Sequence, residues 1–234
     1  MNRRGAIASA LSTAVIVVAM PAASAAQPAP EQATRAASAA QAGASAKARQ
    51  PCTGAYQGDA RLGPEQLPKL WQLPVGPLVL GYQRTGKLSP DAFLKKYWEG
   101  PADKGSWKYP PNDGFAEVNG KLDKRRSQLR PGQWLDRFGS EYGGYLAPAG
   151  DRYAKRALPP QNLNTRDAAF PCDYHVYRVT KRFTVWQGKI APWFEQPGGG
   201  QQIKLDPALL DPGQGQRLNV KWLLDHGYLA PVKW

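Results

Sequence analysis

Three segments of the chain combine residue types that suit the binding of a ligand. The first, Leu135 to Pro148, holds Arg137, several aromatic residues and closely spaced glycines. Glycine lets the backbone approach a ligand closely, and the planar guanidinium of arginine gives paired, charge-assisted hydrogen bonds to anions. The other two are RALPPQNLN, residues 156–164, and IAPWFEQPGGG, residues 190–200, where aromatics and a glutamine lead into a glycine-rich loop. Together the three segments are unusual for a purely structural domain.

Standard catalytic patterns are otherwise missing from the sequence. It contains no phosphate loop and no G-x-S-x-G motif. The two histidines, His175 and His226, lie far apart and lack metal-ligand spacing. The run of three glycines at residues 198–200 is not a dinucleotide-binding fingerprint, because no helical pattern follows it.

Each candidate residue also has a plain structural interpretation. Arg137 could form an ion pair with Asp136 or Glu141, and Gln196 could cap a turn. His175 lies in an alternating pattern and could be a hydrogen-bonded structural residue. The aromatic side chains Phe138 and Tyr145 could belong to the core.

The first fifty residues do not carry these segments. Residues 1–25 read as a secretory signal, with Arg3 and Arg4 before a short apolar run and Ala23-Ser24-Ala25 as a cleavage site. Residues 26–50 are rich in Ala, Gln and Ser and predict a disordered leader. We expect folding to begin near residue 51, with no later stretch apolar and long enough to cross a membrane.

The formal net charge of +13 favours anionic partners in general, without choosing among them. The densest basic cluster lies between Lys121 and Arg130, and a solvated surface is its plainer interpretation. A calcium site is conceivable among Asp206, Asp211 and Asp225, although scattered surface acids explain them as well. We expect no nucleic-acid binding and no membrane association, and the family resemblance described below implies no resident cofactor.

The elements that must position the candidate residues are short. Many prolines and glycines indicate numerous loops, and the alternating segments favour an α+β fold with a compact antiparallel β-sheet core and few short helices, plus a small N-terminal helical and loop-rich appendage. We expect an accessory region over 51–128 and a catalytic domain over 129–234. Helices are predicted after the N-caps Ser89 (as far as Gly100-Pro101, carrying Trp98) and Asn219, and strands over Leu78–Tyr82, Tyr174–Val179, Arg182–Trp186 and Lys189–Ala191.

The chain has two cysteines, Cys52 and Cys172. An exported protein meets oxidising conditions, and an even count favours a disulfide bond between them. This bond would fasten the start of the folded region to the catalytic half. A nucleophilic cysteine is the weaker alternative, because neither residue lies in a motif.

Several motifs, taken in order, resemble the tuberculosis-necrotizing-toxin domain family and its secreted fungal NAD glycohydrolases. In the second half these are LDRFG, YLAPAG, RALPP-x-NLN, YHVYRV and IAPWF-x-QPGGG, followed by a closing GYL. In the first half they are C-x-G-x-Y, LGP-x-x-LP, a helix ending in YW, and YPPNDGF. The resemblance implies hydrolysis of NAD to nicotinamide and ADP-ribose by a secreted, extracellular, toxin-like enzyme, with NADP as a further candidate substrate.

The resemblance also implies roles for individual residues. Arg137 and Arg156 would contact the NAD phosphates, and Gln196 would lie beside the reacting ribose. His175 matches a histidine of the bacterial toxin, with a less defined role. The aromatic residues expected to line the pocket are Phe138, Tyr145 and Trp193.

One residue departs from the family pattern, because Glu195 stands where the family has glycine before the motif glutamine. Its carboxylate could stabilise an oxocarbenium ion or could crowd the loop. Two alternative functions stay open: a non-enzymatic basic binding protein, and an ADP-ribosyl cyclase or transferase that uses the same pocket. The fungal relatives also suggest a homodimer, which the residues themselves do not indicate.

Overall fold

The computed structural model describes residues 51–233, which belong to one compact unit. The expected signal sequence and leader, residues 1–50, lie outside the described residues. Within residues 51–233, no helix has the length and apolar character needed to cross a membrane.

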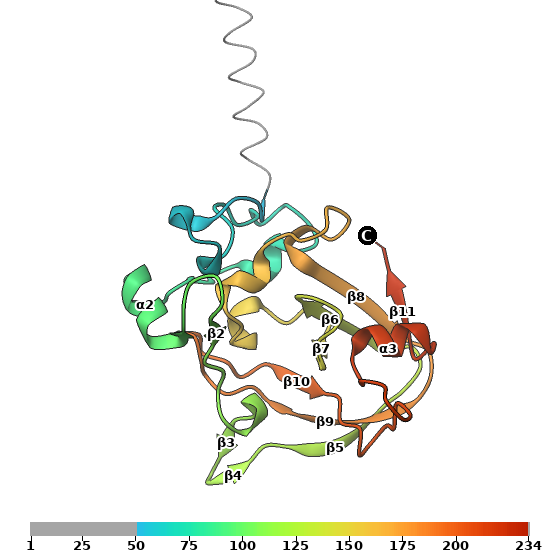
Figure 1. Cartoon of the computed structure of the whole chain (residues 1–234). Coiled ribbons are helices and arrows are strands. Elements are labelled where there is room, and N and C mark those ends of the chain that lie inside the picture. The colour runs from blue at the N-terminus through green and yellow to red at the C-terminus, as the bar shows by residue number, and fades with distance from the viewer. Residues whose placement is uncertain (1–50, 234) are drawn as a thin grey trace, which may run out of the picture. The chain divides into compact units, whose positions relative to one another are not determined.

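The centre of the molecule is a seven-stranded antiparallel sheet with the order β11-β8-β6-β7-β10-β9-β5 (Figure 1). Strand β6 occupies an inner position and pairs with β8 on one side and β7 on the other. The bounds of the seven strands are β5 Arg125–Leu129, β6 Trp134–Phe138, β7 Tyr145–Pro148, β8 Tyr174–Val179, β9 Phe183–Lys189, β10 Gln201–Lys204 and β11 Leu229–Val232. The boundary expected between residues 128 and 129 falls inside β5.

The two faces of the sheet bury different clusters, because successive side chains of a strand point to opposite faces. On β8, Tyr177 and Val179 belong to a core cluster with the C-terminal helix α3, Val220–Asp225. Tyr174 and Val176 pack on the other face against N-terminal residues. This division agrees with the alternation predicted for Tyr174–Val179. The fold is therefore the expected antiparallel core with few short helices.

The N-terminal part consists of short elements and loops, of which Val75, Leu78 and Val79 pack on the second face. Its α-helix, α2, follows Ser89, whose Oγ accepts a hydrogen bond from the Ala92 backbone N–H at 3.2 Å. These elements are η1 Tyr56–Gly58, η2 Ala60–Leu62, η3 Gly76–Val79, α2 Pro90–Tyr97, β1 Trp98–Glu99, β2 Ser106–Trp107, η4 Asn112–Gly114, β3 Glu117–Val118 and β4 Lys121–Leu122. Three further turns follow later in the chain: η5 Tyr153–Arg156, η6 Pro160–Leu163 and η7 Pro171–Asp173.

Three predicted elements were wrong in type or extent. Residues 78–82 form the end of η3 and a turn instead of a strand, because Pro77 starts a helical turn that buries Leu78 and Val79. Helix α2 ends at Tyr97, since Trp98 is already extended and pairs with Trp107. The two strands expected around Gln187-Gly188 are the single strand β9, because Gly188 stays in register with Gln202 of β10.

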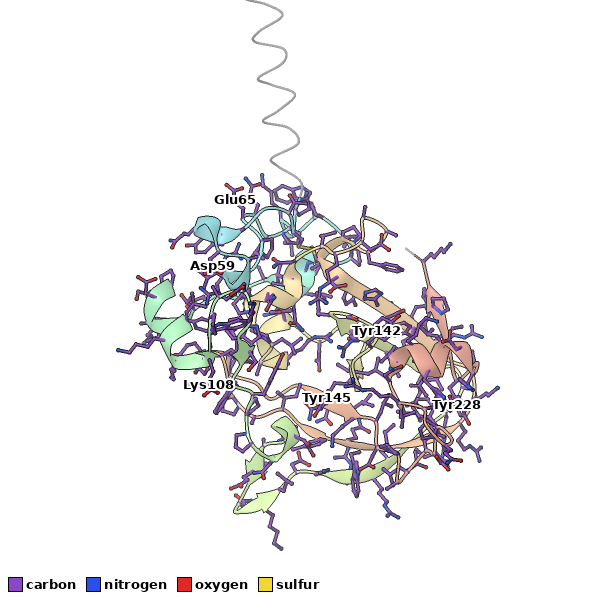
Figure 2. The ribbon with its side chains drawn as sticks, in the orientation of Figure 1. Asp59, Glu65, Lys108, Tyr142, Tyr145 and Tyr228 are labelled. Atoms are coloured by element: carbon purple, nitrogen blue, oxygen red, sulfur yellow. A yellow bond between two sulfur atoms is a disulfide. The ribbon has the colours of Figure 1, made fainter. Side chains whose placement is uncertain are left out.

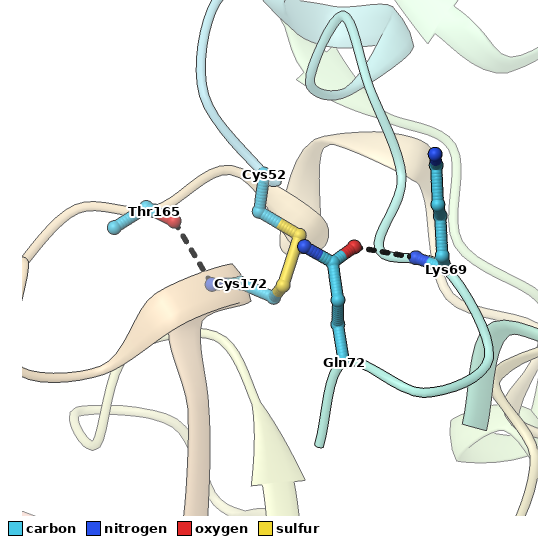
Figure 3. Close-up of a disulfide and its surroundings, with 5 residues drawn as sticks. All are labelled: Cys52, Lys69, Gln72, Thr165 and Cys172. Carbon is cyan, nitrogen blue, oxygen red and sulfur yellow. Dashed lines mark hydrogen bonds between the residues drawn. A yellow bond between two sulfur atoms is a disulfide. The ribbon is translucent and has the colours of Figure 1, made fainter. Parts of the chain in front are cut away.

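The predicted disulfide bond joins Cys52 to Cys172 (Figure 3). Both residues are buried, and their Cα atoms are 4.9 Å apart. The Cys172 backbone N–H also donates to Thr165 Oγ1 at 2.9 Å, as the dashed line in Figure 3 shows. The bond therefore fixes the first described residues to the turn that precedes β8.

Candidate functional site

A cavity of about 470 Å³ lies over the middle strands β6, β7 and β10. Its volume is in the range of small-molecule sites. Tyr145, at the start of β7, lies near the middle of the view in Figure 2. The lining residues are Tyr109, Pro110, Asp113, Gly114, Asp136, Arg137, Phe138, Tyr145, Leu146, Ala147, Arg156, Ala157, Leu158, Asn162, Ile190 and Gln202.

Arg137 lines this cavity and is held by backbone carbonyls. Its Nε donates to Ser140 O at 2.7 Å and its Nη1 donates to Tyr145 O at 2.6 Å. The ion pair with Asp136 or Glu141 that the sequence allowed is not formed. Burial lowers the pKa of the Arg137 guanidinium, but an arginine stays charged in any case. The guanidinium therefore presents a positive charge that no carboxylate among residues 51–233 pairs directly.

The glycine-rich turn after β6 packs closely against the Arg137 side chain. A Cβ atom on Gly143 would lie 2.0 Å from Arg137 Nη2. A contact of that length is impossible without displacement of the guanidinium. The glycine at 143 thus serves the packing of the backbone over Arg137.

Arg156 also lines the cavity, but internal partners occupy its guanidinium. Its Nη1 and Nη2 donate to the two carboxylate oxygens of Asp136 at 2.5 and 2.7 Å. Nε and Nη2 also donate to the backbone carbonyl of Asp151. Both members of the ion pair are buried, and the guanidinium carbon lies 5.2 Å from the centre of the Phe138 ring. This pair builds one wall of the cavity.

Of the three aromatic residues expected in the pocket, Phe138 and Tyr145 line it and Trp193 does not. Phe138 is 1% exposed and packs edge-on against Tyr153 with ring centres 4.9 Å apart. It is therefore also a core residue. Tyr145 is 38% exposed, and partial burial raises the pKa of its hydroxyl group. Its ring is accessible to a ligand.

The side chains of the motif loop at residues 193–196 turn toward the N-terminal part and do not line the cavity. Gln196 is buried, and its Nε2 donates to Gln83 O at 2.5 Å. Trp193 Nε1 donates to Lys108 O at 2.7 Å. These contacts make the loop an anchor between the N-terminal part and β10.

Glu195, the departure from the family pattern, belongs to the same anchor. Its Oε1 accepts from Lys96 Nζ at 2.7 Å and from the Tyr97 hydroxyl at 2.8 Å. These two hydrogen bonds lower the pKa of the Glu195 carboxyl. Glu195 is not among the residues that line the cavity.

Gln202 is a cavity residue that the sequence analysis did not single out. It follows the glycine run by two residues, lies on β10, and donates from Nε2 to Asp113 O at 2.9 Å. Its neighbour Ile203 is buried in the core on the opposite face of the strand. Strand alternation after the glycines was the signal that could have placed Gln202 on the cavity side.

His175 pairs with Arg137 in the β6–β8 register but does not line the cavity. Its Nε2 lies 3.2 Å from Asp173 Oδ1, and its Nδ1 lies 3.6 Å from Glu141 Oε1. The ring stacks on Phe170 with centres 4.3 Å apart. The imidazole is thus buried beside Arg137 on the neighbouring strand β8, where Asp173, Glu141 and Phe170 surround it.

The calcium site considered from the sequence is not supported. Asp206 accepts from Trp186 Nε1, Asp211 from the Gly213 backbone, and Asp225 pairs with Lys221. Among residues 51–233, no three acidic, histidine or cysteine side chains group as a metal site would require. Local hydrogen bonds and an ion pair account for these acids.

Comparison with known proteins assigns the family. Residues 128–232 match the family described as Tuberculosis necrotizing toxin. The conidial surface nicotinamide adenine dinucleotide glycohydrolase nadA of Aspergillus fumigatus is 44% identical over 187 residues, which cover 76% of this chain and 74% of that protein. The chain belongs to the tuberculosis necrotizing toxin family.

Among solved structures, the chain is similar to the tuberculosis necrotizing toxin complexed with its immunity factor. The TM-score is 0.47 at 24% identity, over 66% of this chain and 77% of that one. It is also similar to Tse6 in complex with Tsi6, with a TM-score of 0.28 at 17% identity, over 47% of this chain and 72% of that one.

Proposed function

We propose that this member of the family is a secreted NAD glycohydrolase that releases nicotinamide from NAD and leaves ADP-ribose. The observation that carries the proposal is the cavity over β6, β7 and β10, where Arg137 and Gln202 line the same space. The 44% identity with a nicotinamide adenine dinucleotide glycohydrolase supports the same reaction.

The chemistry suits a site with few acids and bases. The nicotinamide of NAD is already cationic, so it leaves as a neutral molecule with the electron pair of the C1′–N bond. Water supplies the oxygen that bonds to C1′, and its proton passes to solvent. The transition state resembles an oxocarbenium ion. The site must therefore orient the ribose and stabilise its developing positive charge. It needs no general acid, because nicotinamide leaves without taking up a proton.

The structure suggests a division of roles in this reaction. Arg137 binds the diphosphate through the guanidinium edge left open by its carbonyl partners, and Tyr145 supplies an aromatic surface. Gln202 takes the position beside the ribose that the sequence analysis gave to Gln196, which instead anchors its loop. Arg156 acts through Asp136 and the cavity wall. The expected role of His175 becomes support for the strand that carries Arg137.

The relatives also suggest where the protein acts and what kind of partner it binds. The Aspergillus relative is a conidial surface protein, and the Cys52–Cys172 bond is typical of oxidising compartments. We therefore place the mature chain outside the cell that makes it. The tuberculosis toxin was solved with an immunity factor, and inhibition by a bound protein is the corresponding proposal here. Use of NADP and a homodimer stay predictions.

Nicotinamide release by the purified mature chain tests the function. Chromatography of the products should show nicotinamide and ADP-ribose in equal amounts, which separates hydrolysis from cyclisation or transfer. Arg137→Ala should raise KM at least tenfold, because a charge-assisted contact to the diphosphate is lost. A folded wild-type chain that binds NAD without releasing nicotinamide would support the binding-protein alternative.

A further inference from the structure

The segment from Tyr109 to Gly114 is part of the cavity wall, although it precedes the family match at residue 128. It belongs to the sequence motif YPPNDGF, to which the proposed function gives no role. Asp113 and Gly114 lie next to Gln202 of β10, since Gln202 Nε2 donates to the Asp113 carbonyl at 2.9 Å. This segment therefore brings a carboxylate to the side of the cavity that holds Gln202.

Asp113 is the carboxylate of the cavity that is open to a ligand. The other lining carboxylate, Asp136, is 0% exposed and gives both oxygens to Arg156. The Asp113 side chain is 37% exposed. Its Oδ1 accepts no hydrogen bond from the described part of the chain. A cationic group in the cavity can therefore approach Asp113 but not Asp136.

Two lysines fix the other oxygen of this carboxylate. Lys124 Nζ and Lys204 Nζ each lie 3.0 Å from Asp113 Oδ2. Although burial raises the pKa of the Asp113 carboxyl, the hydrogen bonds from Lys204 and Lys124 leave it below its ordinary value. The carboxylate is therefore ionised at neutral pH and restrained in orientation.

The backbone around Asp113 is unusual. Asn112 and Asp113 both have positive φ angles, of 56° and 57°. Two consecutive non-glycine residues in the left-handed region are uncommon, and such strain concentrates at functional sites. The conformation directs Asp113 toward the cavity wall while its carbonyl accepts from Gln202.

We propose that Asp113 is a further catalytic residue of the glycohydrolase reaction, in which Oδ1 stabilises the positive charge that develops on the nicotinamide ribose. The inference rests on the proposed function. As the C1′–N bond breaks, the electron pair leaves with nicotinamide and the ribose gains oxocarbenium character. A fixed carboxylate stabilises this charge most in the transition state. Asp113 keeps its own charge throughout, and the proton of the attacking water passes to solvent.

The alternative is that Asp113 only neutralises the two lysines and supports the loop. Asp113→Asn separates these roles well, because asparagine tolerates the left-handed backbone and has nearly the same shape. The lysine variant Lys124→Met/Lys204→Met removes the same ion pairs but retains the carboxylate. Asp211→Asn is a control outside the cavity, since it neutralises another exposed loop aspartate, whose Oδ1 accepts from the Gly213 backbone N–H.

The experiment measures kcat and KM for nicotinamide release from pH 4 to 9, with thermal unfolding of each variant. We expect Asp113→Asn to lower kcat about 100-fold with KM changed less than about threefold, and Asp211→Asn to match the wild type. The lysine variant should lose less kcat than Asp113→Asn, and its acidic limb should move to higher pH, because the Asp113 carboxyl loses the donors that lower its pKa.

Equal kcat for folded Asp113→Asn and an active wild type would overturn this inference and leave the proposed function intact. An inactive wild type would instead contradict the proposed function. If Asp113→Asn does not fold, the lysine variant decides the question: a shifted acidic limb supports the carboxylate, and an unshifted limb with wild-type kcat overturns its role.

Discussion

Arg137 is fixed by Ser140 O and Tyr145 O, so its orientation does not depend on another charged side chain. Arg156, in contrast, is committed to Asp136 and Asp151. The family resemblance implied the same role for both arginines, contact with the NAD phosphates. These different partners are the reason that we propose Arg137 as the ligand contact and Arg156 as part of the cavity wall.

At the residue scale, Gln202 and Gln196 should respond differently to truncation. Gln202→Ala should lower kcat by about 100-fold with little loss of stability, because it removes a polar group from the cavity. Gln196→Ala should lower the free energy of unfolding by about 1–3 kcal/mol, because it removes a buried amide and the hydrogen bond that it donates to the Gln83 carbonyl. Nicotinamide release and thermal unfolding of both variants check the prediction. Loss of kcat in a fully stable Gln196→Ala variant would return the ribose position to Gln196.

The sequence predicted part of this site and missed the rest for a physical reason. Arg137, Phe138 and Tyr145 lie on adjacent strands within one motif, so their order placed them together. Gln202 was missed because the three glycines before it gave no sign that a strand begins at Gln201. Without that strand, the alternation that orients the Gln202 side chain could not be recognised. Asp113 was missed because its approach to β10 depends on a fold contact 89 residues apart in sequence.

At the scale of elements, the loop before β10 is fastened on two sides. Glu195 binds Lys96 and Tyr97 of α2. On the other side, the backbone N–H of Gly200 donates to Lys155 O of η5 at 3.0 Å. The loop therefore fixes the start of β10, which carries Gln202, relative to α2 and η5.

The contact between Glu195 and α2 should make part of the stability depend on pH. The folded-state pKa of Glu195 is lowered, so its contribution is present above the ordinary glutamate pKa and is lost as pH falls through the folded value. Glu195→Gln should lower Tm by roughly 2–4 °C near pH 7, for a loss of about 1 kcal/mol. The difference from the wild type should shrink toward pH 3. Thermal unfolding between pH 3 and 7 measures it, and a constant difference would contradict the assignment.

The sequence predicted correctly those elements that have a recognisable N-cap residue or an alternating pattern. Ser89 and Asn219 each accept the expected cap hydrogen bond, and Tyr174–Val179 alternates as predicted. The strand predicted over Leu78–Tyr82 was wrong because a short apolar run has no period that separates a strand from a turn of helix. The break expected at Gly188 failed because this glycine serves close packing: a Cβ there would lie 1.7 Å from Asp123 O.

At the scale of the whole molecule, the Cys52–Cys172 bond closes a loop with a sequence separation of 120. Loop entropy gives such a bond about 4–5 kcal/mol as an upper figure. The paired variant Cys52→Ser/Cys172→Ser should therefore lower Tm by roughly 10 °C or more. Calorimetry with and without reductant measures this loss, and the reduced wild type should unfold with the variant. Equal Tm values for the oxidised and reduced wild type would show that the bond adds no stability.

The order of the central sheet leaves β5 and β11 at its two ends. The unpaired edge of a sheet is a template to which strands of further chains can add, so that fibres grow. β5 begins with the exposed residues Arg125 and Arg126, and β11 contains Pro231, which has no N–H to offer. Both edge strands are thus unsuited to accepting another strand, which protects the protein from polymerising through its own backbone.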